Sequence, residues 1–145
     1  KAQVKNLGLR DSVQFIGYLD RKQALPDCYA AANAFVFASR TETQGLVLLE
    51  AMAAGLPVIA LSEMGTTDIL SPGRGAISPP AEVKAFGETL GNFLNQPSAW
   101  HHLRQEAPVY AQEWSDVAMA ARLACLYREQ AGLKIASERP LTAAA

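Results

Sequence analysis

Two short apolar runs on either side of one helical segment constrain this chain more than any other feature. Residues 34–37 and 58–61 contain only apolar residues, most of them strand formers. Runs of this length without polar alternation are typical of strands buried on both faces, as in a parallel sheet. Residues 46–54 between them form a helical run, which Gly55 caps and Pro57 ends. The sequence therefore predicts a strand–helix–strand unit with parallel strands.

Turn residues and apolar patterns extend this unit in both directions. Residues 13–16, Val-Gln-Phe-Ile, are rich in strand formers and are followed by a glycine, which predicts a short strand. Asp20 is placed to cap a helix expected over 21–32. After the central unit, the sequence predicts a helical turn at 66–70 and another short strand at 75–78.

Three helices are expected after residue 80. Apolar residues recur every three or four positions over 83–93, which gives one stripe along a helix. A second helix is expected to start at residue 97 or 98 and to be broken or kinked by Pro108. The last helix is expected over 116–130, with a cap at residue 115 or 116 and an end at Gly132.

This order of elements indicates the fold class. Alternating strands and helices followed by helices predict an α/β fold: a Rossmann-like parallel sheet with flanking helices, then C-terminal helices. The three to four expected strands are few for a doubly wound sheet, which usually has about five or six. The 145 residues begin at Lys1, so we expect a piece of a longer chain that lacks the front of its domain. Residues 1–132 would form this partial domain, and 133–145 a poorly ordered tail.

Composition excludes several functional classes. Half of the residues are apolar and 19% are charged, so the chain can bury a core. A formal charge of −1 disfavours a nucleic-acid binder, and no nucleic-acid partner is expected. Two cysteines and two adjacent histidines provide neither a disulfide framework nor metal-ligand spacing. The longest uncharged apolar run, 51–61, is far shorter than the roughly 18–20 residues of a membrane span.

The polar loop 39–44 and the helix start at Gly45 lie where a ligand is expected, because ligands bind outside the carboxyl ends of parallel strands. The free N–H groups of the helix start favour an anion such as a pyrophosphate, and Gly45 lets a ligand approach the backbone. Glu50, one turn into the helix, is suited to accept two hydrogen bonds from a vicinal diol such as a ribose. Glu42 can reach the far side of the phosphates, where a donor sugar would lie. A glutamate early in a helix is also favourable through the helix dipole alone.

These residues carry a resemblance to a known family. Residues 42–58 read Glu-Thr-Gln-Gly-Leu-Val-Leu-Leu-Glu-Ala-Met-Ala-Ala-Gly-Leu-Pro-Val. They resemble the pattern Glu-x-Phe-Gly-x4-Glu-Ala-Met-Ala-x-Gly-x-Pro-Val of the family 4 retaining glycosyltransferases, or glycosyl transferases group 1. Both carboxylates fall in register, whereas Gln44 stands in place of the family's Phe. The resemblance extends upstream through 13–17 and 34–39 and more loosely downstream, and covers about 1–130.

The resemblance implies the later part of the donor-binding domain of the two-domain GT-B fold. It implies that Glu42 is the catalytic residue that contacts the donor hexose hydroxyls and that Glu50 binds the donor ribose. The backbone from Gln44 to Val47 would meet sugar and phosphate. The donor-binding residues expected in this way are Leu19 (near the base), Thr43, Gln44, Gly45, Leu46, Val47 and Glu50. The substrate would be a UDP- or GDP-sugar, with no metal and no further cofactor.

The resemblance also bears on partners. The family's basic pair for the pyrophosphate and its acceptor site lie upstream, so the fragment alone is expected to be inactive and to need the N-terminal domain of its own chain. The acceptor is expected to be a lipid or a glycan. The expected location is the cytoplasm, in part at the inner face of the membrane. The last helix is apolar over much of its circumference and predicts self-association.

Two alternatives to a transferase remain open. The first is a nucleotide-sugar-binding module without transfer activity. The second is a relative on the same architecture, such as a sugar-nucleotide epimerase or a glycogen phosphorylase relative, which the Ala-Met-Ala-x-Gly-x-Pro-Val run disfavours.

Other polar side chains have a structural interpretation beside a functional one. Arg40 either approaches a phosphate or pairs with a nearby acid. Thr66 and Thr67 either face the sugar or start a helical turn. Arg74 either orients a loop near the donor or occupies a plain turn, and Cys28 is expected in the core.

Overall fold

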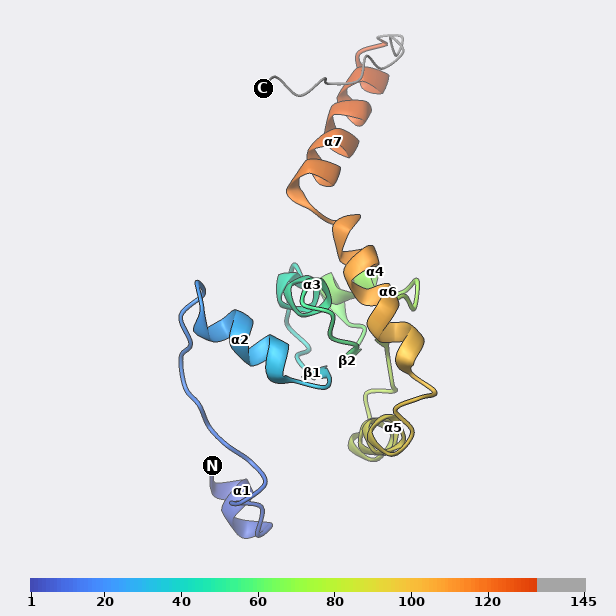
Figure 1. The fold of residues 1–145 in the computed structure, drawn as a ribbon. Coiled ribbons are helices and arrows are strands. Elements are labelled where there is room, and N and C mark those ends of the chain that lie inside the picture. The colour runs from blue at the N-terminus through green and yellow to red at the C-terminus, as the bar shows by residue number, and fades with distance from the viewer. Residues whose placement is uncertain (133–145) are drawn as a thin grey trace.

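The computed structural model describes residues 1–132 and places a small parallel sheet at their centre (Figure 1). The strands are β1 (Phe35–Phe37), β2 (Val58–Ala60) and β3 (Ala76–Ile77), in the order β1-β2-β3. Both strand pairs are parallel, with Val36 opposite Ile59 and Ile59 opposite Ile77. The predicted α/β fold with a parallel sheet is therefore confirmed. The tail expected over 133–145 lies outside the described residues.

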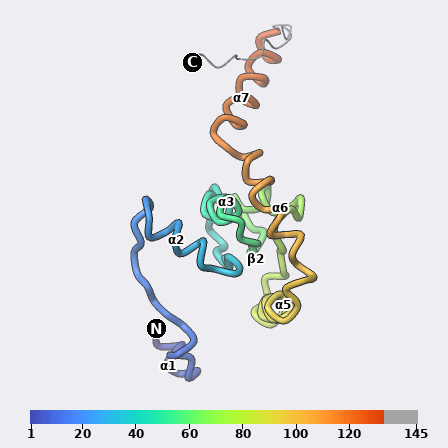
Figure 2. The backbone as a smooth tube through the Cα atoms, viewed as in Figure 1, coloured from blue at the N-terminus to red at the C-terminus, as the bar shows by residue number. Residues whose placement is uncertain are grey.

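The helices surround this sheet unevenly. They are α1 (Ala2–Asn6), α2 (Ala24–Ala31), α3 (Leu46–Ala53), the 3-10 turn η1 (Met64–Thr66), α4 (Thr67–Leu70), α5 (Val83–Asn95), α6 (His101–Gln112) and α7 (Asp116–Gln130). Helix α3 packs against α6 and both neighbouring strands. The tube in Figure 2 shows α1 and α2 on one side, α5 and α6 on the other, and α7 leading away from the body.

The core lies between β2, α3, α4 and α6. Every residue of β2 is buried, as predicted for a strand covered on both faces. One cluster of buried residues joins the elements: Leu48, Ala51, Met52, Leu56, Val58, Ala60, Ile69, Leu70, Ala76, Ala107, Tyr110 and Ala111. Its members from α6 come late in the chain, so α6 closes the core that the strand–helix–strand unit begins.

Strand β1 differs from the expectation of burial on both faces. Val36 at its centre is 44% exposed. Within residues 1–132, β1 pairs only with β2, and its neighbours Phe35 and Phe37, not Val36, pack against the core cluster. The apolar run therefore predicted the strand correctly but not the covering of its second face.

The strand predicted at 13–16 is absent from the described structure, where this segment is irregular. Phe15 and Ile16 are 54% and 59% exposed. A strand is stable only when a neighbour accepts its ladder hydrogen bonds, and residue preference alone does not supply one. The prediction failed because no strand in residues 1–132 lies beside this segment.

The predictions for the two helices after residue 80 also differ from the structure in part. The stripe predicted over 83–93 buries Phe93, but Val83 is 92% exposed at the start of α5. Helix α6 begins at His101, later than expected, and continues through Pro108 instead of breaking there. Its residues Ala107 and Tyr110 belong to the core cluster, and this packing offsets the backbone hydrogen bond that a proline lacks.

Helix α7 follows the prediction closely. Ser115 caps it, its hydroxyl oxygen accepting a hydrogen bond from the Ala118 N–H at 3.2 Å. Gly132 follows the end of α7 with a φ of +64°, the left-handed conformation that glycine adopts without strain. No helix within residues 1–132 is both long and apolar enough to cross a membrane.

Arg74 fixes the loop before β3 onto α6. Its Nη1 donates to Glu113 Oε1 at 2.6 Å and its Nε to Glu106 Oε1 at 3.4 Å. The guanidinium lies 4.7 Å from the ring centroid of Tyr110, within cation–π range. The hydrogen bond from Arg74 to Glu113 contributes most to raising the pKa of Arg74. Arg74 therefore holds the fold together, which favours a structural role over orientation of a ligand loop.

Candidate functional site

The loop between β1 and α3 is fixed by the loop that follows β2. The Leu61 N–H donates to the Phe37 carbonyl oxygen at 3.1 Å, and the Gly65 N–H donates to the Glu42 carbonyl oxygen at 3.0 Å. These bonds join the two loops at the carboxyl ends of neighbouring parallel strands. This is the edge of an open sheet where ligands bind.

Two glycines allow this close packing. A Cβ on Gly65 would lie 2.0 Å from the Thr43 carbonyl oxygen, so no side chain fits there. A Cβ on Gly45 would lie 2.7 Å from Ile69 Cδ1, and the φ of Gly45 is +70°. Gly45 is buried, and its lack of a side chain allows the helix start to pack onto α4. Gly65 was missed by the sequence analysis, because a lone glycine in a loop carries no contact information.

The Glu42 carboxylate turns back onto the start of α3. Its Oε1 accepts hydrogen bonds from the Gln44 and Gly45 N–H groups, both at 3.0 Å. These two backbone bonds, with that from Gln44 the larger, hold the pKa of Glu42 below its ordinary value. Glu42 therefore occupies the anion position at the helix start, and in this structure it does not extend to the far side of that position as expected.

Glu50 lies one turn further along α3 and pairs with Arg21, whose Nη2 donates to Glu50 Oε1. The two side chains line a pocket of about 350 Å³ between α2 and α3. Its remaining walls are Leu25, Pro26, Tyr29, Ala53 and Ala54. Tyr29 and Glu50 line this pocket together, and burial, and next the charge of Glu50, raise the pKa of the Tyr29 phenol.

The other expected donor-binding residues fall into two places. Thr43 and Gln44 are exposed in the loop, Leu46 is 55% exposed at the helix start, and Val47 is half-buried. They gather with Glu42 and Gly45 around the first turn of α3. Leu19 is half-buried in the irregular segment before Asp20 and lies outside the residues that line the Glu50 pocket.

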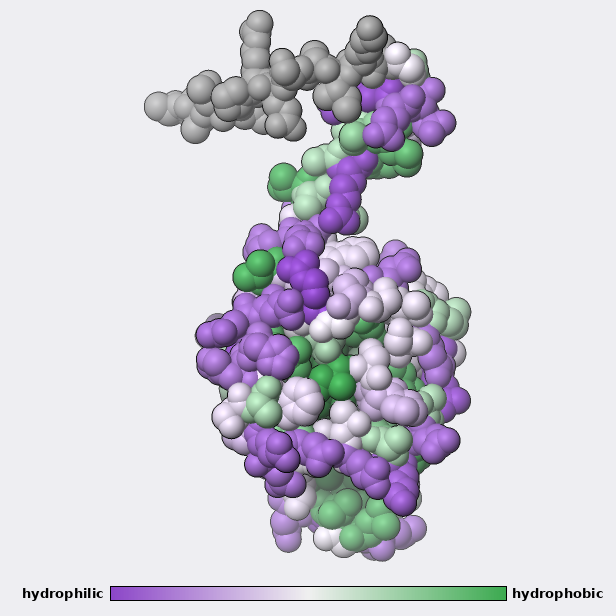
Figure 3. Space-filling view, turned by 90° about the vertical axis from the view of Figure 1, so that its right-hand side faces the viewer, coloured by the Kyte–Doolittle hydropathy of each residue, from purple (hydrophilic) through white to green (hydrophobic). Residues whose placement is uncertain are grey.

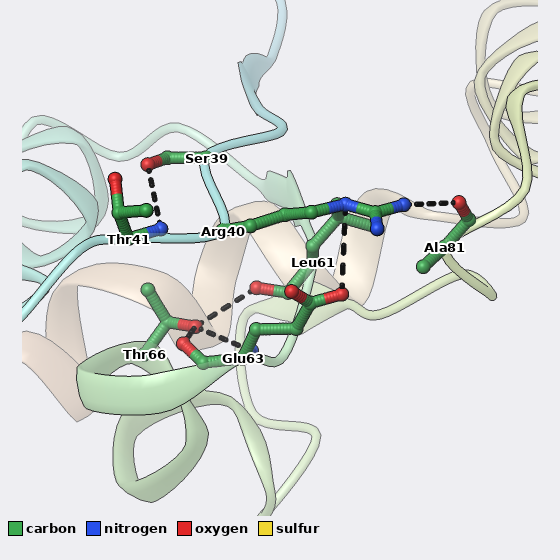
Figure 4. A network of polar contacts seen from close by, with 7 residues as sticks. All are labelled: Ser39, Arg40, Thr41, Leu61, Glu63, Thr66 and Ala81. Carbon is green, nitrogen blue, oxygen red and sulfur yellow. Dashed lines mark hydrogen bonds and ion pairs between the residues drawn. The ribbon is translucent and has the colours of Figure 1, made fainter.

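Arg40 extends across the same edge of the sheet (Figure 4). Its Nη2 donates to the Ala81 carbonyl oxygen at 2.9 Å, and its Nε lies 3.9 Å from Glu63 Oε1. Arg40 thereby links the loops that follow all three strands, and it lines a second pocket of about 380 Å³ with Leu61 and residues of α5. Of its two interpretations, the structure supports pairing with a nearby acid.

Thr66 is fully buried and does not face a ligand. Its hydroxyl accepts a hydrogen bond from the Glu63 N–H at 3.0 Å and lies 2.8 Å from the Leu61 carbonyl oxygen, to which it can donate (Figure 4). It therefore starts the helical turn η1–α4, the structural one of its two interpretations. Within residues 1–132, no group of three or more His, Cys, Asp or Glu side chains is arranged to hold a metal ion. Cys28 is half-buried in α2, outside the core cluster.

The family follows from a comparison with known proteins. The family model described as "Glycosyl transferases group 1" matches residues 1–111, which is more than half of the chain. The chain belongs to this family. The two carboxylates at the start of α3 are thus those of a group 1 glycosyltransferase.

Characterised relatives of this glycosyltransferase are sugar transferases. The mannosylfructose-phosphate synthase of Agrobacterium fabrum is 41% identical over 91 residues, 62% of this chain and 20% of the relative. The D-inositol 3-phosphate glycosyltransferase of Streptomyces scabiei is 33% identical over 122 residues, 83% of this chain and 27% of the relative. The chain thus spans about a fifth to a quarter of the length of these relatives.

Two solved structures share the fold of this glycosyltransferase. Sucrose-phosphate synthase from Thermosynechococcus elongatus superposes with a TM-score of 0.72 and 28% identity, covering 90% of this chain and 33% of its own. HepE from Anabaena, solved in complex with UDP, superposes with a TM-score of 0.71 and 22% identity, covering 89% of this chain and 35% of its own. Both are GT-B glycosyltransferases, and the identity with HepE supports the fold alone.

The glycosyltransferase motif located the carboxylates but not their partners. Arg21 and Tyr29 lie outside the motif, 29 and 21 positions before Glu50 in a segment read only as a capped helix. The only pattern in the sequence that bears on Arg21 was Asp20, because its expected capping role places Arg21 in the turn at the start of a helix. Side chains that meet across two helices are set by packing, which a single sequence does not record.

Proposed function

We propose that this chain forms the donor-binding part of a retaining glycosyltransferase that transfers a hexose from a UDP- or GDP-sugar. One observation carries the proposal: the segment 42–50 presents one carboxylate in the loop before α3 and a second one within α3. Glu42 accepts hydrogen bonds from the Gln44 and Gly45 N–H groups just before the helix, while Glu50 lines a pocket with apolar walls. A ligand with a charged diphosphate and a neutral nucleoside would fit these two neighbouring positions.

The nucleoside is proposed to occupy the pocket between α2 and α3. A carboxylate has two oxygens and can accept one hydrogen bond from each hydroxyl of a ribose diol. The apolar walls from Leu25, Pro26 and the alanines of α3 suit the flat face of a base. UDP is the first ligand to test, because HepE, which shares the fold, was solved with it.

The diphosphate is proposed to lie near the start of α3, where backbone N–H groups and the helix dipole favour an anion. Glu42 holds that position in the present structure. On donor binding it would release Gln44 and Gly45 and turn toward the hexose hydroxyls as the catalytic residue. We propose no metal and no further cofactor for this site.

The transfer itself is proposed to need residues from the rest of the natural protein. In it, the anomeric carbon of the hexose loses its bond to the diphosphate and gains one to an acceptor hydroxyl oxygen, whose proton leaves. The acceptor is proposed to be a lipid or a glycan, used in the cytoplasm or at the inner face of the membrane. A phosphorylated sugar or polyol belongs in the same assay, since the names of two relatives include such compounds.

Calorimetric titration of the natural full-length protein with UDP- and GDP-sugars tests the proposal. We expect one donor class to bind, and Glu50→Gln to weaken it by about 10- to 100-fold, the range for hydrogen bonds to a charged group. Glu88→Gln, on an exposed side chain of α5, is the matched control and should leave binding unchanged.

The outcomes separate the alternatives. A wild-type protein that binds no nucleotide sugar contradicts the proposal. Donor binding without product on lipid, glycan or sugar-phosphate acceptors would favour the binding module that lacks transfer activity. An isomerised sugar nucleotide among the products would favour the epimerase relative.

A further inference from the structure

The carboxylate of Glu50 already has a partner, and that partner lies outside the family motif. Arg21 reaches it from the turn before α2, 29 positions earlier in the chain. The side chain of Arg21 is 71% exposed and that of Glu50 is 31% exposed, so the pair sits at the rim of the pocket that both residues line.

The backbone that carries Arg21 is held firmly. The Asp20 carboxylate accepts hydrogen bonds from the N–H groups of Lys22, Gln23 and Ala24, at 3.1, 3.0 and 3.3 Å. These bonds, led by those from Gln23 and Ala24, lower the pKa of Asp20, so it is ionised at neutral pH. The turn therefore presents Arg21 to α3 from a fixed position beside the first turn of α2.

The side of Glu50 toward α2 is also restricted. Tyr29 comes from α2 and lines the same pocket as Glu50. Burial, and next the charge of Glu50, raise the pKa of its phenol. Glu50 thus shares its pocket with a guanidinium, which it bonds, and a phenol, both supplied by the segment 20–31. A carboxylate held in this way loses less side-chain entropy when a ligand binds.

We propose that Arg21 is a positioning residue that holds the Glu50 carboxylate ready for the nucleoside of the donor. Its N–H engages Oε1, and the acceptor capacity of Oε2 remains for the ribose diol. This inference rests on the proposed donor-binding function. It adds that the segment before α2, and not only the motif on α3, sets the affinity for the nucleoside.

A plain surface ion pair is the competing explanation, since exposed pairs contribute about 0–1 kcal/mol to stability and often do nothing else. The two explanations differ in what they predict for binding. A positioning role acts through Glu50, so it must affect a neutral nucleoside and its diphosphate alike. The effect of Arg21 on binding must also disappear when residue 50 is no longer a carboxylate.

The test uses the natural full-length protein and whichever of UDP and GDP it binds, together with the matching nucleoside. Calorimetry gives the Kd for wild type, Arg21→Ala, Arg21→Lys, Glu50→Gln and the double variant Arg21→Ala/Glu50→Gln. Lys22→Ala is the matched control, because it removes an exposed cation from the adjacent position. Arg21 is exposed on a turn, so its replacement leaves the core intact.

We expect Arg21→Ala to weaken nucleoside and nucleotide binding by the same factor, about 2- to 5-fold, as an ion pair of this exposure allows. Arg21→Lys should recover part of the loss, and Lys22→Ala should bind like wild type. In the Glu50→Gln background, Arg21→Ala should cause no further loss.

Three results would overturn the inference while leaving the proposed function intact. The first is Arg21→Ala binding as tightly as Lys22→Ala. The second is a loss confined to the diphosphate, and the third is a full additional loss in the Glu50→Gln background, which would mean that Arg21 contacts the ligand directly. A wild-type protein that binds neither UDP nor GDP overturns the proposed function and this inference with it.

Discussion

Glu42, in the loop before α3, and Glu50, within α3, are the same residue type, yet their neighbours give them different properties. Glu42 bonds to the backbone of the two residues just before α3, whereas Glu50 bonds to a side chain from the turn before α2. The motif predicted that both positions hold carboxylates. It did not predict these partners, because one depends on a loop conformation and the other on the packing of α2 against α3.

A pH prediction follows for Glu42. Its pKa lies below the ordinary value of 4.5 in the folded state, so the native fold favours its ionised form. This contribution to stability is complete above the unfolded pKa and is lost as the pH falls through the lower, folded pKa. We expect Glu42→Gln to lower the Tm at neutral pH and to approach the wild-type Tm in acid. Thermal melts at stepwise lower pH check this, and a Tm difference that stays constant into acid would contradict it.

A second residue-scale prediction concerns Arg74, which bridges Glu106 and Glu113 on and just after α6. Replacing it with alanine leaves two nearby carboxylates without their cation and removes the contact with the Tyr110 ring. We expect Arg74→Ala to lower the Tm clearly more than Arg122→Ala, which removes an exposed arginine from α7. Equal Tm values for the two variants would show that the bridge is only a surface contact.

At the scale of elements, the sequence predicted those whose signals are local. The unit β1–α3–β2 and the cap and end of α7 follow from apolar runs, Ser115 and Gly132. The strand expected at 13–16 failed because pairing requires a neighbour. Of the two effects expected of Pro108, a break or a kink, the break is absent because the core packing of α6 prevailed. Local residue patterns therefore predicted an element correctly where its formation does not depend on packing against residues far away in the sequence.

The packing of the two site loops predicts contrasting effects for two glycines. Gly65→Ala would place a Cβ 2.0 Å from the Thr43 carbonyl oxygen and must displace the loop that carries Glu42. Overpacking of this kind costs about 1–3 kcal/mol of unfolding free energy. Gly87→Ala in α5 meets nothing within 4 Å and should stabilise the protein by about 0.5–1 kcal/mol. Denaturant unfolding measures both, and a neutral Gly65→Ala would contradict the tight loop packing.

At the scale of the whole molecule, α7 stands apart from the core. None of its residues is buried. Figure 3 shows hydrophobic residues at the surface of the narrow segment that projects from the body, where Figure 1 places α7. Leu123, Leu126 and Tyr127 are 51%, 51% and 67% exposed and follow helical spacing, so they share one side of α7.

We expect this apolar side of α7 to drive reversible self-association of the 145-residue chain. Leu123→Glu combined with Leu126→Glu should return the chain to a monomer, since each buries a charge at such a contact. Ala121→Glu adds the same charge to the opposite side of α7 and should not change the association. Sedimentation at several concentrations measures the state, and a wild-type chain that stays monomeric throughout would contradict the expectation.

The position of α6 in the chain also bears on how the protein folds as it is synthesised. All three strands and α3 come from the continuous stretch 35–77, so every strand of the sheet is translated before α6. Ala107 and Tyr110, which close the core over α3, are translated only later. Until α6 has been translated, the α3 residues of this core lack the side chains that cover them in the folded protein. During that interval on the ribosome, α3 is the surface that a chaperone would recognise.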